Sequence, residues 1–192
     1  MQKPIARNAP ELDRLLERFL RRFAFVGPTN IVSFADRFAE FLKATELPRD
    51  PVHLLSRMGI RLARAQLDSA RAVWAKEGEE YVIYCGRYER PASVSFTLFH
   101  EVFEILAHHP RFPTALSDWL EQRLANQFAA ALLMPEEAIR HEAARFRTNQ
   151  ECLVPILAER FGVSLSAMRK RLYELRIGNG RPANRTGAPL SR

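Results

Sequence analysis

Four ionisable residues follow one another at helical spacing within the segment 96–109: His100, Glu101, Glu104 and His108. At about 100° per residue they share one face of a predicted helix, and the aromatic and aliphatic side chains fill the opposite arc. Ligands one turn apart can converge on one ion, and a neighbouring carboxylate can activate a bound water. The pattern is therefore compatible with a metal site on this helix.

A polar stripe is also what any amphipathic surface helix turns to solvent, so the residues alone leave both interpretations open. A His-Glu-x-x-His pentapeptide would favour the metal site more strongly, but the fifth residue here is Glu104. Glutamate is an acceptable zinc ligand. A second carboxylate, however, lowers the net charge of the complex and makes its bound water less acidic.

A second predicted helix, over residues 117–134, carries Glu121 on its apolar face beside Ala125, Phe128 and Leu132. A buried acid needs a partner, and a metal ion is one. The alternative is structural, with Asp118 capping the helix and Glu121 completing a capping box three residues later.

The residues 96–101, Phe-Thr-Leu-Phe-His-Glu, and the block 121–135, with Ala-Asn-Gln-Phe-Ala-Ala-Ala-Leu-Leu-Met-Pro at its end, resemble the ImmA/IrrE metallopeptidases. Those proteins carry a FTLAHELGH-like helix and a following E-x-x-A-N-x-F-A-x-x-L-L-M-P helix. The likeness covers roughly residues 31–176, and the Ala-Asn to Met-Pro block is its most specific part. The resemblance implies a gluzincin-like zinc peptidase of the bacterial cytoplasm, whose best-known relatives cut DNA-binding repressors in stress responses or mobile-element control.

The resemblance also implies roles for single residues. His100 matches the first ligand, and Glu101 matches the general base, which would take a proton from the attacking water and pass it to the leaving amine. Glu104 stands where the family has its second histidine. The family's downstream glutamate falls on a glutamine, with a glutamate displaced by one position. The expected zinc ligands are therefore His100, Glu104 and Glu121, with Gln122 or His108 as substitutes. A rival within the family is a pseudo-enzyme that keeps the fold and the protein-binding groove but not the reaction.

A second class of function comes from two short helices predicted around Gly162, over residues 153–161 and 165–175. A helix, a glycine turn and a helix are typical of DNA-binding helix-turn-helix motifs. Candidate nucleic-acid contacts on the second helix and at its end are Arg169, Lys170, Arg171 and Arg176. The alternative is a terminal hairpin packed on the peptidase fold, and Pro155 argues for a kinked or shortened first helix.

The composition of the 192 residues, 47% hydrophobic and 27% charged, is that of an ordinary globular protein. The net charge of +7 suggests a polyanionic partner. Most of this charge lies after Leu165, where the sequence contains seven basic residues and one acidic residue. No apolar run approaches the roughly 18 residues of a membrane span. We therefore expect a cytoplasmic protein. Cys85 and Cys152 are too few for a disulfide framework.

The elements that must position these residues form an α+β, mainly helical fold, zincin-like by resemblance, with a small antiparallel sheet. Apolar periodicity and breakers predict helices over 10–23, 31–42, 51–58, 93–108, 117–134 and 136–146, and β-prone runs at 70–74 and 81–85 within 60–86. Four parts are expected along the chain: a helical extension over 1–30, a metallopeptidase domain over 31–147, the helix-turn-helix-like segment over 148–177 packed on it, and a flexible basic tail over 178–192.

Overall fold

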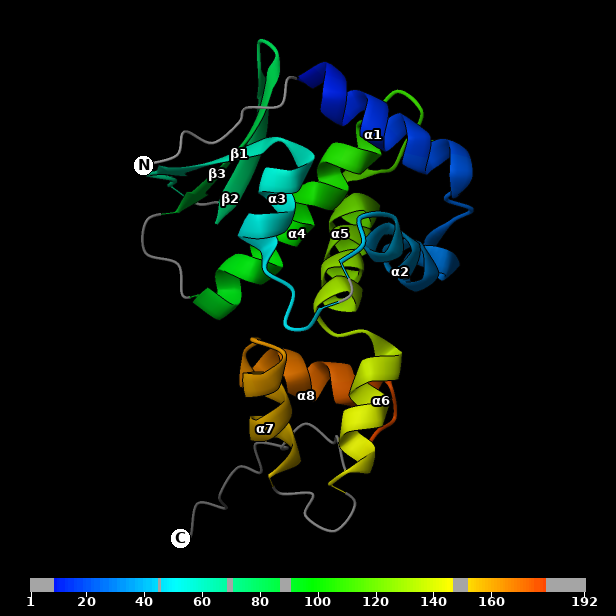
Figure 1. Ribbon diagram of the computed structural model, residues 1–192, viewed down its shortest axis with the longest axis vertical. Coiled ribbons are helices and arrows are strands. Elements are labelled where there is room, and N and C mark those ends of the chain that lie inside the picture. The colour runs from blue at the N-terminus through cyan, green and yellow to red at the C-terminus, as the bar shows by residue number, and fades with distance from the viewer. Residues whose placement is uncertain (1–8, 45, 69–70, 87–90, 147–151, 179–192) are drawn as a thin grey trace, which may run out of the picture.

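The computed structural model describes residues 9–44, 46–68, 71–86, 91–146 and 152–178, which form a larger and a smaller lobe (Figure 1). The larger lobe holds α1 (Ala9–Arg22), α2 (Ile31–Phe41), α3 (Pro51–Met58), α4 (Pro91–Ala107), α5 (Asp118–Leu133) and the strands β1 (Ile60–Ala65), β2 (Ala72–Glu77) and β3 (Glu80–Gly86). The smaller lobe holds α6 (Glu136–Ala144), α7 (Leu153–Arg160) and α8 (Leu165–Glu174). The α+β, mainly helical fold class is confirmed. The domain boundary expected near 147 and the tail after Gly178 fall outside the described residues.

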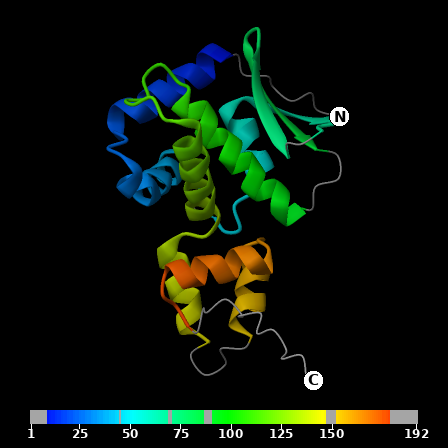
Figure 2. The same ribbon diagram turned by 180° about the vertical axis from the view of Figure 1, so that it is seen from behind.

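The centre of the larger lobe is the α4–α5 pair. Viewed from behind, α4 crosses between the sheet and α5 (Figure 2). Phe103 of α4 and Phe128 of α5 pack with ring centroids 5.3 Å apart, and Phe38 of α2 lies 5.5 Å from Phe128. Because these rings are almost fully buried, they hold the two helices that carry the candidate site at a fixed separation.

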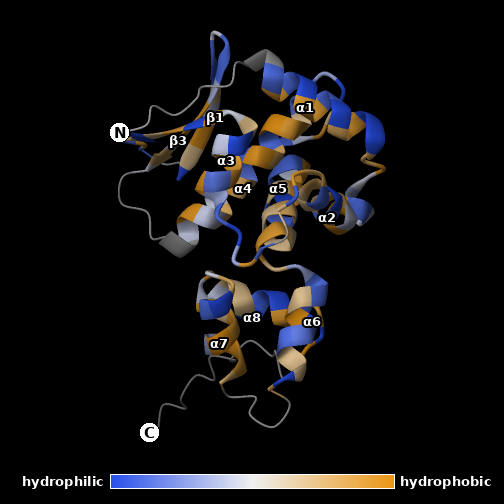
Figure 3. Ribbon diagram, in the orientation of Figure 1, coloured by the Kyte–Doolittle hydropathy of each residue, from blue (hydrophilic) through white to orange (hydrophobic). Residues whose placement is uncertain are grey.

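Helix α1 belongs to the same core. Its apolar stripe of Leu12, Leu16 and Phe19 is buried, and the Phe19 ring lies 5.0 Å from the rings of both Phe34 and Phe38. Colouring by hydropathy shows the same division, with hydrophobic turns facing the body and hydrophilic turns facing outward (Figure 3). The first helix therefore packs on α2 rather than standing apart from the body.

Helix α3 begins and ends where its sequence predicts. The Asp50 side chain accepts hydrogen bonds from the backbone N–H groups of Val52 (2.9 Å) and His53 (3.3 Å), and Pro51 takes the first helical position. Gly59 ends the helix with φ of 78°, a conformation that glycine adopts without strain. This helix leads directly into β1 and fixes where the sheet starts.

The sheet is mixed, which corrects the expectation of an antiparallel one. β3 lies in the centre, pairing antiparallel with β2 through a tight turn at Gly78 and parallel with β1. The hairpin was expected from the two β-prone runs, whereas β1 was not expected as a separate strand. β2 is an edge strand, and its free edge faces α4.

Two further details differ from or extend the sequence analysis. The N-cap of α5 is Ser117, with no side-chain capping bond, so Asp118 is already inside the helix and the capping-box alternative for Glu121 is wrong. Neither Cys85 nor Cys152 is part of a disulfide bond. Among the described residues no helix has the length and apolar character needed to cross a membrane.

A candidate active-site groove

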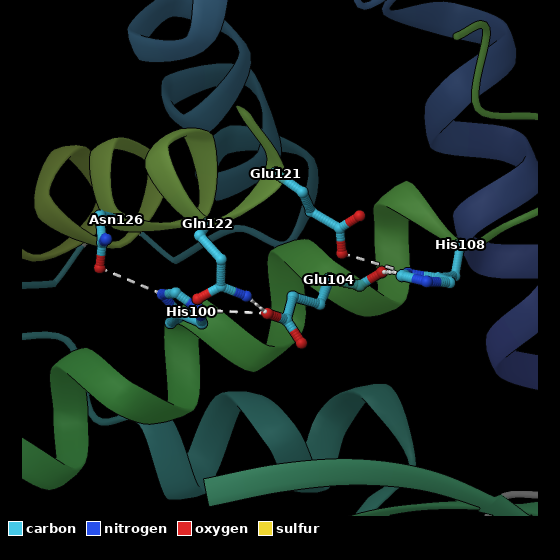
Figure 4. Close-up of polar contacts among 6 residues, drawn as sticks. All are labelled: His100, Glu104, His108, Glu121, Gln122 and Asn126. Atoms are coloured by element: carbon cyan, nitrogen blue, oxygen red, sulfur yellow. Dashed lines mark hydrogen bonds and ion pairs between the residues drawn. The ribbon is translucent and has the colours of Figure 1, made fainter. Parts of the chain in front are cut away.

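The candidate site lies where α4 faces α5 (Figure 4). His100 stands between two oxygen atoms: its Nε2 lies 3.2 Å from Oε1 of Glu104, and its Nδ1 lies 3.2 Å from Oδ1 of Asn126. The Gln122 amide Nε2 donates a hydrogen bond to the same Oε1 of Glu104. Four side chains from two helices therefore form one hydrogen-bonded cluster, which we call the His100 cluster.

The charges of the His100 cluster reinforce one another. Burial by itself lowers the pKa of His100, but the hydrogen bond and negative charge of Glu104 outweigh it and raise that pKa above its ordinary value. Burial likewise raises the pKa of Glu104, but the hydrogen bond and charge of His100, with help from Gln122, lower it below its ordinary value. Each partner therefore favours the charged form of the other.

Glu101 follows His100 on α4, and only 5% of its surface is exposed. Burial, together with the nearby charge of Glu104, raises its pKa to about 7, against the opposing effects of His100 and of a hydrogen bond from the Trp74 backbone on β2. The carboxyl is therefore tied to the edge strand and sits close to half-protonated at neutral pH. A carboxyl in this state is suited to proton transfer.

The other two expected ligands pair with each other beyond the end of α4: His108 follows the last residue of that helix, and Glu121 lies in the first turn of α5. Nδ1 of His108 is 3.3 Å from Oε1 of Glu121 and 2.9 Å from the Glu104 carbonyl oxygen, and its ring packs against Trp74 with centroids 5.3 Å apart. Burial raises the pKa of Glu121. Glu121 therefore points to His108 and away from the His100 cluster, and Gln122 takes the place beside Glu104.

The residues present do not fit a catalytic zinc ion. Such an ion takes three protein ligands, usually from histidine, aspartate, glutamate and cysteine, and leaves one position for water. Within the described ranges no three such side chains are placed to hold one ion. His100 and Glu104 converge as predicted, but the third place belongs to a neutral amide that turns its N–H group, a donor, toward Glu104.

A hollow of about 560 Å³ opens over this cluster and is lined by His100, Glu101, Glu104 and Gln122 together with Trp74 and Thr97. A second hollow of about 990 Å³ continues from it along α5 to α8. The two share four lining residues, Arg71, Phe96, Gln122 and Asn126. Together they form a continuous groove, which we call the α4–α5 groove.

Asn126 and Trp74 were not expected among the site residues. Asn126 follows Gln122 by four residues, so helical spacing alone places both on one face of α5, and that signal was present. The contribution of Trp74 is its backbone N–H group at the edge of β2. No side-chain pattern reveals a backbone contact of this kind.

The candidate nucleic-acid residues divide into two groups. Arg169, Lys170 and Arg176 are exposed. Arg171 is buried, and its Nε donates a 3.0 Å hydrogen bond to the Met134 carbonyl oxygen at the end of α5. The expectation that Arg171 contacts nucleic acid is therefore wrong, because its guanidinium joins α8 to the larger lobe.

Comparison with known proteins supports the peptidase resemblance. A Mycobacterium tuberculosis transcriptional regulator of known structure superposes with a TM-score of 0.55 at 17% identity, over 90% of this chain and 55% of that chain. At this identity the likeness concerns the fold alone, and the chain spans about half the length of that regulator. No curated protein sequence matches. The family model for the IrrE N-terminal-like domain, a peptidase family, matches residues 55–173. The chain therefore belongs to the IrrE N-terminal-like domain family.

Proposed function

We propose that this chain is a polypeptide-binding regulator that keeps the fold and groove of its peptidase family without a zinc-dependent reaction. The observation that carries the proposal is the hydrogen bond from the Gln122 amide to Glu104. It gives the third ligand position a neutral donor group, and it uses a carboxylate oxygen that a metal would need.

The α4–α5 groove supports polypeptide as the ligand class. It is long and open, and one wall is the edge strand β2, through Ala72, Val73 and Trp74. An edge strand offers backbone groups to an extended peptide, which can add to the sheet as a further strand. Val73, 40% exposed, and Trp119, 68% exposed, add apolar surface on β2 and at the start of α5.

The partner that we propose is a regulatory protein of the cytoplasm. The neighbour in the structural comparison is by name a transcriptional regulator, and we extend a regulatory role to this chain as part of the proposal. The competing function is the zinc-dependent endopeptidase implied by the family resemblance, with Glu101 as general base. DNA binding through the exposed Arg169, Lys170 and Arg176 is a third function, and it does not require the groove.

A peptide-retention assay tests the proposal. Immobilised protein is incubated with a pool of random dodecapeptides, with and without zinc, and the bound and free peptides are identified by mass spectrometry. We expect retained peptides to stay intact in both conditions. Asn126→Trp, which fills the groove where its two hollows meet, should abolish retention, and Glu159→Trp on the exposed face of α7 should not.

Two results would overturn the proposal. Zinc-dependent cleavage that disappears in Glu101→Gln would establish the endopeptidase instead. Equal retention by the wild type and by Asn126→Trp, or no retention at all, would remove the groove from the function.

A further inference from the structure

A second concave surface lies away from the α4–α5 groove, between α1, the end of α2 and α3. It encloses about 600 Å³, and none of its lining residues lines the α4–α5 groove. Its charged lining is entirely cationic, and its floor includes apolar side chains. The cations are Arg18 and Arg22 of α1, Lys43 after α2 and Arg57 of α3, and the floor includes Leu15 and Phe41. We call this surface the α1–α3 groove.

The acidic side chains of α1 and two of its arginines lie on different sides of the helix. Asp13 accepts hydrogen bonds from Tyr81 (2.7 Å) and Lys76 (3.1 Å) of the sheet, and Glu17 pairs with Arg21 and Arg111. The acids of this part of the helix are therefore engaged on the side facing the sheet and the α4–α5 connection. Arg18 and Arg22, one turn apart, are left on the α1–α3 groove.

Within the described part of the chain, Arg18, Arg22 and Lys43 make no ion pair, and all three are exposed. Like charges gathered around one hollow raise its electrostatic potential and attract anions. The arrangement favours a ligand that carries several negative charges.

Lys43 supplies an independent observation. It has φ of 53°, in the left-handed region, at the position after α2 where its N–H bonds the Glu40 carbonyl and the next N–H bonds the Ala39 carbonyl. Glycine is the residue that this helix ending prefers, because a side chain there is strained. The Lys43 side chain lines the groove although its backbone adopts a conformation that glycine tolerates better.

We infer that the α1–α3 groove binds single-stranded nucleic acid. Guanidinium groups pair with phosphates through two parallel hydrogen bonds, and three of the four cations are arginines. The apolar floor with Phe41 offers a surface for an unpaired base. A duplex hides the faces of its bases, so it can use the cations but not the floor.

The binding of a fluorescein-labelled oligothymidylate of about 12 nucleotides, measured by anisotropy over a series of salt concentrations, tests the inference. Phosphate contacts by Arg18, Arg22 and Lys43 predict a log–log salt slope of about −2.1 for the wild type. The double variant Arg18→Gln/Lys43→Gly should make the slope shallower by about 1.4 and weaken binding at low salt at least about tenfold. The matched control Arg169→Gln/Lys170→Gln removes the same charge from α8 and should change the affinity less than about threefold.

The single variant Lys43→Gly separates binding from folding. It relieves the left-handed strain, so its melting temperature should rise while its affinity for the oligonucleotide falls. Equal losses in the groove variant and the α8 control would overturn the inference, as would tighter binding of a duplex than of the single strand. Displacement of the oligonucleotide by poly-glutamate as effectively as by unlabelled oligothymidylate would show that the groove prefers an acidic polypeptide, and would overturn it too.

Discussion

Glu101→Gln should stabilise the metal-free protein at pH 8 and have a much smaller effect at pH 4.5. A pKa of about 7 in the folded chain, against an ordinary value of 4.5, means that folding favours the protonated carboxyl. Stability associated with this group is complete below pH 4.5 and is lost as the pH rises through 7. The difference in pKa corresponds to about 3 kcal/mol at alkaline pH.

Glutamine is uncharged and close in shape, and its side-chain oxygen can still accept the hydrogen bond from the Trp74 backbone. Urea unfolding of both proteins in EDTA, at pH 4.5 and at pH 8, measures the effect. The gain in free energy of unfolding should grow by about 3 kcal/mol between the two pH values. Glu79→Gln, at an exposed position on the hairpin turn, serves as the isosteric control and should show no such growth. An identical effect of Glu101→Gln at both pH values would refute the reasoning.

Three further predictions concern the stability of the fold. Arg171→Ala should lower the free energy of unfolding by about 2 kcal/mol, because it leaves the buried Met134 carbonyl without its partner, whereas Arg169→Ala on the exposed face should change it by less than about 0.5 kcal/mol. Asp50→Ala removes the N-cap of α3 and should cost about 1 kcal/mol in the same urea titration. Gly162→Ala should also destabilise the protein by about 1 kcal/mol, since φ is 63° there; an unchanged midpoint would contradict the assigned conformation.

The helices could be predicted from the sequence because the signals that define them are local. Apolar periodicity and capping residues set each helix independently of the rest of the chain, as at Asp50 and Gly59 of α3. β1 lacks such a signal. Its parallel pairing with β3 joins segments about twenty residues apart, and the intervening β2 lies at the opposite edge of the sheet. Pairing of this kind depends on the assembled fold.

In the candidate site, too, the contact within one helix could be predicted from the sequence, and the contact between two helices could not. His100 and Glu104 lie on one helix, so their spacing brings them together whatever surrounds them. Whether Glu121 or Gln122 joins them depends on how α5 is rotated about its axis against α4. Consecutive residues point in directions about 100° apart around a helix, so only one of the two can face Glu104. Packing of Phe128 and Leu124 into the core sets that rotation and leaves Gln122 facing Glu104.

Arg171 shows how a charge pattern can mislead. It stands in a run of basic residues, which favoured a nucleic-acid contact. It also lies three residues after Met168 and four before Leu175, which places it on the apolar stripe of α8. Helical periodicity was the better guide here, because the position relative to buried neighbours decides exposure more strongly than the residue type.

Metal content tests the central claim most directly. The wild type and the double variant Glu104→His/Gln122→Glu, which restores a His-Glu-x-x-His pentapeptide and an acidic third ligand, are dialysed against zinc and then against buffer, and the metal is measured by mass spectrometry. We predict that the double variant retains one zinc ion per chain and that the wild type retains essentially none. A wild type that holds zinc stoichiometrically, and loses it on His100→Ala, would contradict the account.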